Sequence, residues 1–392
     1  MNIFFFIYKE PDLDCYLPIG LELKKINKNL NISLVFCNKS NYTKIIEDDF
    51  TKKILLKNFN IITFNANKNY LIQKYFNLIN FIKILKKIIF KKNISCFFPK
   101  IIITNKKLLF ILKKLKVKIV YICTERHIFT TSILSNDRWK ETLLRFGQKD
   151  IEKFHCLFFF HRENFYYKYI NELSNINTKK IFFIGLPYRY PAWCNIVKKE
   201  VNQIELKLRK KFYDYTSIYT IIAAKEFDNT VLEKKTSLFN SLYNIVQDLL
   251  NLEPKCIIFF RLHPKDENPL YLRKFLKKNK SNRFVLTKYN YDVLSQISKN
   301  FFFIFGTSLR TDVMDVKKID CSEFPKKKLY KYKKNMNGYN IKHIILRNKS
   351  IHSSRYKLNH IFLKKDFNTK KTDELVRKNP YNVKFILRKI LY

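Results

Sequence analysis

The chain has 392 residues, 46% of them hydrophobic, which excludes a disordered tail or a small disulfide-held scaffold and allows two or three domains. Its formal net charge is +45, a balance that ordinarily indicates nucleic acid or an anionic membrane surface as a partner. The lysines are spread along the whole chain and only 5 residues are glycine, so a bias towards A/T-rich codons explains much of the charge. Because codon bias explains much of the charge, we do not expect nucleic acid as a partner. An anionic membrane surface stays compatible with the charge.

The eight cysteines show neither C-x-x-C pairs nor zinc-ligand spacing, which is typical of reduced, buried thiols. The apolar start at Ile3–Tyr8 meets the charged residues from Lys9 onward too early for a signal peptide. No apolar run approaches the roughly 18 residues of a membrane span. We therefore expect a cytoplasmic protein, peripheral on the inner face of the cytoplasmic membrane if its substrate is membrane-bound.

In the first half of the chain, short runs of β-branched and aromatic residues alternate with lysine-rich amphipathic stretches. The runs predict strands at Asn2–Tyr8, Ile32–Phe36, Ile61–Phe64, Lys100–Thr104, Lys118–Cys123, Cys156–Phe160 and Lys180–Ile184. The stretches between them predict helices at Leu13–Lys28, Asn69–Lys92, Lys106–Leu115, Arg138–Phe146 and Glu163–Leu173. Continuous apolar strands separated by helices indicate a parallel sheet covered on both faces.

A segment rich in proline and aromatic residues, Gly185–Pro191, interrupts this alternation, which then resumes. Strands are predicted at Tyr219–Ala223, Cys256–Phe260, Arg283–Leu286 and Phe301–Phe305, and helices at Glu233–Leu250, Pro269–Asn279 and Asp292–Ser298. The fold class is therefore α/β, with two doubly wound, Rossmann-like domains facing across a cleft. We expect an N-terminal Rossmann-like domain over residues 1–190, a C-terminal Rossmann-like domain over 191–330, and a lysine-rich extension over 331–392 that packs back on them.

Two segments of the second half carry side chains suited to binding phosphate. Arg261 and His263 follow an apolar strand, at the end where ligands bind in such sheets. About forty residues later, a second apolar strand runs into Gly306-Thr307-Ser308, with Asp312 four residues beyond Ser308. Free N–H groups at the start of a following helix would bind phosphate. Each segment alone is also compatible with an ordinary strand end.

Together the two segments resemble the donor domain of GT-B-type glycosyltransferases of bacterial capsule and lipopolysaccharide synthesis. In those families a strand ends in His-Pro, and a later strand leads to a Ser-Ser or Thr-Ser turn with an acidic residue four positions on. The usual Gly-Lys-Pro turn is replaced here by Asp315-Val316-Lys317-Lys318. Phe146-Gly147-Gln148 with Asp150, and Gly185-Leu186-Pro187-Tyr188-Arg189, resemble two further segments of the same families.

The resemblance implies a role for each site residue. Arg261, His263, Gly306, Thr307 and Ser308 would bind the donor phosphates, and Asp312 the ribose or the sugar. A general base is needed near the reacting hydroxyl, and Glu125 or His127, after the strand Lys118–Cys123, would fill that role. Arg189 is either a phosphate clamp or a hinge residue. No metal and no cofactor beyond the nucleotide-sugar substrate is expected, because the helix dipole, Arg261 and His263 suffice for the leaving phosphate.

Two other groups have structural interpretations. The acidic cluster Glu10, Asp12 and Asp14 is a rival source of the base, although its place favours a charge group at a helix start. His155 and His161 flank one strand six residues apart, which favours core or loop positions over a metal site.

The sequence thus predicts a retaining or inverting glycosyltransferase that moves a sugar from a nucleotide donor to a glycan or lipid-linked acceptor. Three alternatives stay open. One is a nucleotide-sugar 2-epimerase of the same fold, and another is a non-enzymatic basic protein that binds nucleic acid or a polyanionic glycan. The third is a transferase that has lost its activity, which the missing Gly-Lys-Pro turn permits.

Overall fold

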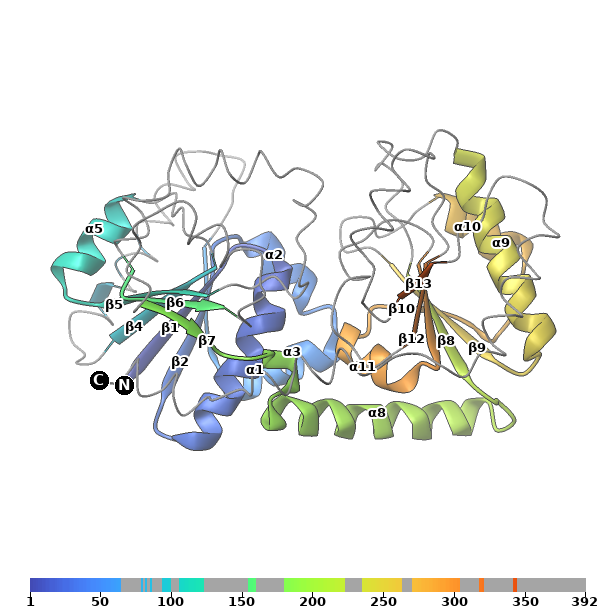
Figure 1. The fold of residues 1–392 in the computed structure, drawn as a ribbon, viewed down its shortest axis with the longest axis horizontal. Coiled ribbons are helices and arrows are strands. Elements are labelled where there is room, and N and C mark those ends of the chain that lie inside the picture. Colours follow the sequence, from blue (N-terminus) through green and yellow to red (C-terminus); the bar gives the residue numbers. More distant parts are fainter. Residues whose placement is uncertain are drawn as a thin grey trace. The chain divides into compact units, whose positions relative to one another are not determined.

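The structure, a computed structural model, describes residues 1–64, 79, 82, 85–86, 94–99, 106–122, 154–159, 180–222, 235–262, 270–303, 317–320 and 341–343. These residues form two compact α/β units (Figure 1). The first unit extends to Ile196 and the second begins at Val197.

The first unit contains a seven-stranded sheet in the order β3-β2-β1-β4-β5-β6-β7, and every neighbouring pair is parallel. Its strands are β1 (Asn2–Ile7), β2 (Asn31–Phe36), β3 (Asn60–Thr63), β4 (Ile94–Phe98), β5 (Lys118–Ile122), β6 (Cys156–Phe159) and β7 (Ile181–Phe183). The order reverses between β1 and β4, as in a doubly wound fold.

Aromatic side chains fill both faces of this sheet. Phe5 stacks on Tyr16 of helix α1 (Glu10–Ile26), with ring centroids 4.6 Å apart. On the opposite face, Phe6 stacks on Phe98 at 4.4 Å. Such rings bury a large apolar area, so the many phenylalanine side chains packed on this sheet stabilise it.

Three further helices of the first unit are α2 (Lys39–Ile45), α3 (Asp49–Asn58) and α5 (Lys106–Lys114). Asn38 and Asp48 cap the first two by accepting backbone N–H bonds. Gly20 of α1 lies against Phe59, since a Cβ at this position would meet the Phe59 ring at 2.6 Å. Its close approach explains why glycine is retained in the middle of a helix.

The segment after β7 is firmly packed. Gly185 has a φ of 71°, a conformation that favours glycine, and the short 3-10 helix η3 (Pro187–Arg189) follows. The Tyr190 hydroxyl donates to the Ile184 carbonyl at 2.6 Å. Helix α8 (Pro191–Lys211) then begins, and its Ala192 N–H donates to the Glu22 carboxylate of α1 at 2.8 Å. A carboxylate at a helix start stabilises it, so α1 anchors the beginning of α8.

The second unit contains a six-stranded parallel sheet in the order β10-β9-β8-β11-β12-β13. Its strands are β8 (Ile218–Ile222), β9 (Ile257–Arg261), β10 (Phe284–Thr287), β11 (Asn300–Phe303), β12 (Lys317–Asp320) and β13 (Ile341–His343). This is the strand order 3-2-1-4-5-6 of dinucleotide-binding folds, with the reversal between β8 and β11.

Helices cover both faces of the second sheet. A core built on Tyr219, Phe260 and Phe302 packs under α9 (Lys235–Leu252) and α10 (Leu270–Lys278), which lie side by side (Figure 1). On the other face, Tyr291 of α11 (Tyr291–Ile297) meets Phe301 at 5.1 Å.

The described strands confirm the expected fold class of two Rossmann-like α/β units, and most predicted boundaries agree with the structure within two residues. The main differences are the strands β4 (Ile94–Phe98), β12 and β13, which were not expected, and the unexpected helices α2, α3 and α8. The strands β12 and β13 place Lys317, Lys318 and residues 341–343 in the second sheet rather than in a turn and a C-terminal extension. The predicted strand Lys100–Thr104 and the helices Arg138–Phe146 and Glu163–Leu173 lie outside the described residues. Within the described part of the chain, no helix has the length and apolar character needed to cross a bilayer.

Candidate functional site

The strand order of the second sheet defines where a ligand is expected. In doubly wound sheets, ligands bind beyond the carboxyl ends of the strands, where the order reverses. That reversal lies between β8 and β11, whose carboxyl ends are Ile222 and Phe303. The strand β9, which ends at Arg261, is the other neighbour of β8.

The register places these three ends in one row. Phe303 pairs with Ile222, and Ile222 pairs with Arg261. Since neighbouring strands lie about 4.8 Å apart, the Cα atoms of Arg261 and Phe303 are roughly 10 Å apart. The predicted segment Gly306-Thr307-Ser308 begins three residues after Phe303, so both predicted phosphate-binding segments follow strands at the same edge of this sheet.

Arg261 is partly buried and held in a defined orientation. Its Nε donates to the Tyr289 carbonyl at 3.3 Å, and its guanidinium carbon lies 5.8 Å from the centre of the Tyr291 ring. No further hydrogen-bond acceptor for this guanidinium is found among the described residues. A braced guanidinium with terminal N–H groups to spare is suited to an anionic oxygen.

The aromatic residues that brace Arg261 were not singled out from the sequence. Tyr289 and Tyr291 follow β10, and Tyr289 also packs edge-on against Phe259 at 6.1 Å. The sequence contained a pattern that could have indicated these residues, because Tyr289-Asn290-Tyr291 comes soon after the predicted strand Arg283–Leu286. What the sequence lacked was the pairing of β10 with β9.

Most of the other predicted site residues cannot be placed. Glu125, His127, His263, Gly306, Thr307, Ser308 and Asp312 lie outside the described residues. The strand before Glu125 and His127, β5, ends at Ile122 as expected. Asp320 and His343 extend the row of Arg261 and Phe303, as the last residues of β12 and β13, and no pattern in the sequence indicated them.

The corresponding reversal of the first sheet lies between β1 and β4. The loop that follows β1 there is held by hydrogen bonds from its own backbone N–H groups to Asp12 of helix α1. The fully buried Asp12 carboxylate accepts the backbone N–H bonds of Tyr8 at 2.9 Å and Lys9 at 3.0 Å. The Asn41 amide donates to the Tyr8 carbonyl at 2.7 Å. Asp12 is thus part of a helix-start charge group, which confirms the structural interpretation of that acidic cluster.

Tyr8 lies beside Cys37 at this edge. Burial, followed by the neighbouring Cys37 thiol and the Asp12 carboxylate, raises the pKa of the Tyr8 phenol well above its usual range. The phenol therefore stays protonated at neutral pH. It can act as a hydrogen-bond donor at the edge of the first sheet, but not as a base.

Arg189 lies in η3, partly buried, and its backbone N–H donates to the Leu186 carbonyl at 2.9 Å. Its neighbours Pro187 and Tyr188 are buried. This places Arg189 in the packed connection that follows β7, and its role as a phosphate clamp or a hinge residue stays a prediction.

His155 has a structural position, as expected. Its Nδ1 accepts the Ile119 backbone N–H at 3.0 Å, and the backbone N–H of His155 donates to the Ile119 carbonyl at 2.8 Å. Burial lowers the pKa of His155, and the charges of Lys180, Lys118 and Lys113 lower it further. The described residues contain no group of three or more His, Cys, Asp or Glu side chains placed to bind a metal ion.

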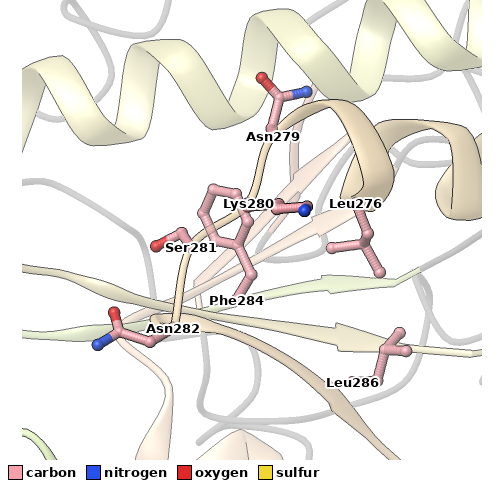
Figure 2. Close-up of a pocket in the computed structure, with 7 residues that line it drawn as sticks. All are labelled: Leu276, Asn279, Lys280, Ser281, Asn282, Phe284 and Leu286. Atoms are coloured by element: carbon pink, nitrogen blue, oxygen red, sulfur yellow. The ribbon is translucent and has the colours of Figure 1, made fainter.

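A surface hollow of about 480 Å³ lies elsewhere on the second unit, at the turn between α10 and β10 (Figure 2). It is lined by Leu276, Asn279, Lys280, Ser281, Asn282, Phe284 and Leu286. The hollow is open and carries no acidic group, and its turn residues precede β10 rather than follow it. It is therefore separate from the carboxyl edge that holds Arg261.

No protein-family model matches the chain, and no curated protein matches its sequence. Solved structures do match its fold. The UDP-GlcNAc 2-epimerase of Neisseria meningitidis, bound to UDP-GlcNAc, aligns with a TM-score of 0.59 and 13% identity over 100% of both chains. The UDP-GlcNAc 2-epimerase of Methanocaldococcus jannaschii aligns with a TM-score of 0.57 and 16% identity, over 97% of this chain and 100% of that one.

The UGT71G1 protein of Medicago truncatula, complexed with UDP-glucose, aligns with a TM-score of 0.56 and 10% identity over 100% of this chain and 98% of that one. At identities this low, the likeness shows the fold alone. The chain thus has the GT-B-type fold of two Rossmann-like units, which confirms the resemblance that the sequence indicated.

Proposed function

We propose that the protein is an enzyme acting on a nucleotide-activated sugar, and that the carboxyl edge of its second sheet binds the diphosphate of that substrate. The observation that supports this most is the register that sets Arg261 and the end of β11 in one row across the strand reversal. A diphosphate at this edge would lie between a guanidinium on one side and the Gly306-Thr307-Ser308 turn on the other.

The chemistry of these groups fits the leaving half of a nucleotide sugar. Departure of a nucleoside diphosphate develops negative charge, which fixed N–H donors and a guanidinium stabilise. Arg261 would supply one such group, His263 and the backbone of Thr307 and Ser308 the others. Asp312 would accept hydrogen bonds from the ribose or the sugar.

For the reaction itself, we propose epimerisation at C2 of a UDP-sugar. Two UDP-GlcNAc 2-epimerases that align over nearly the whole of both chains support this choice. Inverting C2 would break its C–H bond while the electron pair forms a C1–C2 double bond and expels UDP; UDP would then add back to C1 as a proton returns to the other face of C2, so acid–base chemistry is needed. Glu125 or His127, following β5 of the first unit, would carry that proton.

Glycosyl transfer is the second candidate. It is supported by the plant protein with UDP-glucose bound and by the spacing of Thr307-Ser308 and Asp312, which resembles that of surface-carbohydrate transferases. A capsule or lipopolysaccharide acceptor would be the substrate in that case, and the same Glu125 or His127 would deprotonate its hydroxyl.

Incubating the purified protein with UDP-GlcNAc alone and following the sugar by proton NMR separates the two reactions. An epimerase produces the C2 epimer without any acceptor. A transferase leaves the UDP-sugar intact until a glycan acceptor is added. The absence of turnover in both experiments, across a panel of UDP-sugars, would contradict the enzyme proposal.

The binding site is tested separately by calorimetry with UDP. Arg261→Ala should weaken UDP binding about ten-fold or more, because a charge-assisted hydrogen bond is lost. Arg273→Ala removes an exposed arginine of the same unit on α10 and serves as the matched control, with an expected change below about two-fold. Equal effects of the two substitutions would show that Arg261 makes no specific contact.

A further inference from the structure

The acidic residues are unevenly distributed along the chain, whereas the lysines are spread over its whole length. Between Phe50 and Thr124 the chain has seventeen lysines and neither an aspartate nor a glutamate. The chain average of 32 acidic residues in 392 would place about six in these 75 positions. This half of the first unit therefore carries a concentrated positive charge that the total charge alone does not reveal.

Helix α5 lies inside this segment and presents two different faces. Leu108 and Leu112 are buried, with exposed fractions of 6% and 0%, and they attach the helix to its unit. Phe110 is 59% exposed, and Lys113 and Lys114 are exposed beside it at the spacings of one helical turn. The Lys114 ammonium lies 4.8 Å from the centre of the Phe110 ring. An aromatic ring is thus held in solvent among lysines.

The turn after α5 continues this surface. Leu115 is 38% exposed, and Lys116 is exposed with a φ of 54°. The Lys116 N–H donates to the Lys113 carbonyl and the Val117 N–H to the Leu112 carbonyl, each at 3.0 Å. These two bonds form a Schellman motif, in which glycine normally occupies the position of Lys116. We call Phe110, Lys113, Lys114, Leu115 and Lys116 the α5 patch.

Lysines from other elements add to the positive charge near the α5 patch. The charges of Lys113, Lys118 and Lys180 all reach His155, so they gather at the edge where β5, β6 and β7 begin. Within the described part of the chain, no carboxylate lies at ion-pair distance from Lys113, Lys114 or Lys116. Among the described residues, the patch is therefore a basic surface without a paired carboxylate, and exposed apolar side chains lie at its centre.

We propose that the α5 patch docks the protein on a bilayer surface that contains anionic phospholipids. Lysines are attracted to the negative lipid headgroups, and each is worth about a five-fold gain in partitioning. Phe110 and Leu115 would enter the boundary between headgroups and acyl chains, where aromatic and aliphatic side chains are stabilised. A nucleic-acid backbone would attract the lysines equally, but offers no apolar layer for Phe110 and Leu115.

This docking leaves the opposite edge of the first sheet accessible. The patch lies where β5 begins, whereas Glu125 and His127 follow the end of β5. The inference does not rest on the proposed function, since it concerns a different surface and is measured without any nucleotide sugar.

The test is co-sedimentation of the full chain with vesicles. One set consists of phosphatidylcholine alone, and the other contains about one third phosphatidylglycerol. We expect binding to the anionic vesicles only, weakened by added salt. The double variant Lys113→Glu/Lys114→Glu should lower partitioning about twenty-five-fold or more, and Phe110→Ser about five-fold.

The matched control is Lys274→Glu/Lys277→Glu on α10. It makes the same change of charge on an exposed helix of equal length that buries its aromatic residues Tyr271 and Phe275. This control should lower partitioning by less than about three-fold. Thermal unfolding of every variant verifies that it remains folded.

Three outcomes would overturn the proposal. Equal losses for the α5 and α10 variants would show adhesion by total charge, and full binding by Phe110→Ser would show that no apolar contact forms. Loss of binding to duplex DNA by the α5 variant, with vesicle binding unchanged, would assign the patch to a nucleic acid instead.

Discussion

The two sheets share the strand order of doubly wound folds, but Asp12 and Glu253, two carboxylates that each accept several hydrogen bonds, lie at opposite ends of their sheets. In the first sheet, the buried Asp12 closes the loop after β1, at the carboxyl edge. In the second sheet, Glu253 lies at the amino edge, where it accepts hydrogen bonds from Tyr219 at 2.7 Å and also from Ser217 and Lys299. The carboxyl edge of the second sheet instead presents Arg261.

Two sheets of the same topology thus carry different groups next to the reversal of their strand order. A carboxylate next to a strand reversal repels a diphosphate, and an arginine attracts one. The same reversal is therefore suited to an anionic ligand in the second unit, and to a self-contained loop in the first. Substitutions at each edge test whether the two carboxylates are structural, as the comparison requires.

The largest effect is expected for Asp12→Ala. It leaves the N–H groups of Tyr8 and Lys9 without their acceptor in a buried loop, which costs about 3 kcal/mol of folding free energy. Hydrogen exchange should increase in peptides from β1 and stay unchanged in those from β8. If the variant instead lost UDP affinity and kept its protection, Asp12 would be a ligand residue and the comparison would fail.

A smaller effect is expected for Glu253→Gln, about 1.5 kcal/mol at neutral pH, because the charge that Lys299 contacts is removed. Although burial opposes it, the hydrogen bonds from Lys299, Ser217 and Tyr219 lower the pKa of Glu253 below its ordinary value of 4.5. The Glu253 carboxylate therefore stabilises the fold fully at pH values above its pKa in the unfolded chain. This stabilisation is lost as the pH falls towards the lower pKa of the folded protein.

Chemical unfolding at pH 7 and at pH 4 measures this dependence. The difference between wild type and Glu253→Gln should shrink at the lower pH, and protection should change in β8 rather than in β1. A difference that is independent of pH would show that packing, and not the carboxylate charge, is what Glu253 contributes.

The smallest effect has the opposite sign. Lys116→Gly should stabilise the first unit by about 0.5 kcal/mol, because glycine adopts the positive φ of this position without strain. The same change removes one lysine from the α5 patch, so vesicle binding should fall about five-fold while the melting temperature rises. If stability and vesicle binding both rose or both fell, the conclusion that Lys116 contributes to binding and costs stability would be wrong.

Much of the fold followed from the sequence, because buried parallel strands are continuous apolar runs whose ends are marked by charged and turn residues. Strands β1, β2, β5 and β8 to β11 are examples. β4 was missed because its run, Ile-Ser-Cys-Phe-Phe, continues without a break from a lysine-rich segment predicted as helix. Helices α2 and α3 were missed because they are short, and their recognition rests on caps at Asn38 and Asp48 rather than on periodicity.

For the candidate site, the sequence predicted which residues carry the chemistry. Arg261 was predicted together with His263 and the Gly306-Thr307-Ser308 segment, because an arginine that ends an apolar strand is, by itself, also compatible with an ordinary strand end. The bracing by Tyr289 and Tyr291 could not be predicted, since it depends on β10 pairing with β9, and pairing between distant strands leaves no local signal.

The fold class, the alternation of strands and helices, and the two segments suited to phosphate could all be predicted from local sequence patterns. The strand order that brings the end of β9 within two strands of the end of β11 is a property of the folded chain. The tertiary structure also decided which charges are used internally, as Asp12 and Glu253 are, and which face solvent, as Lys113 and Lys114 do. The physical reason is that strand composition fixes burial locally, whereas the partners of a charge are set by packing between elements far apart in the chain.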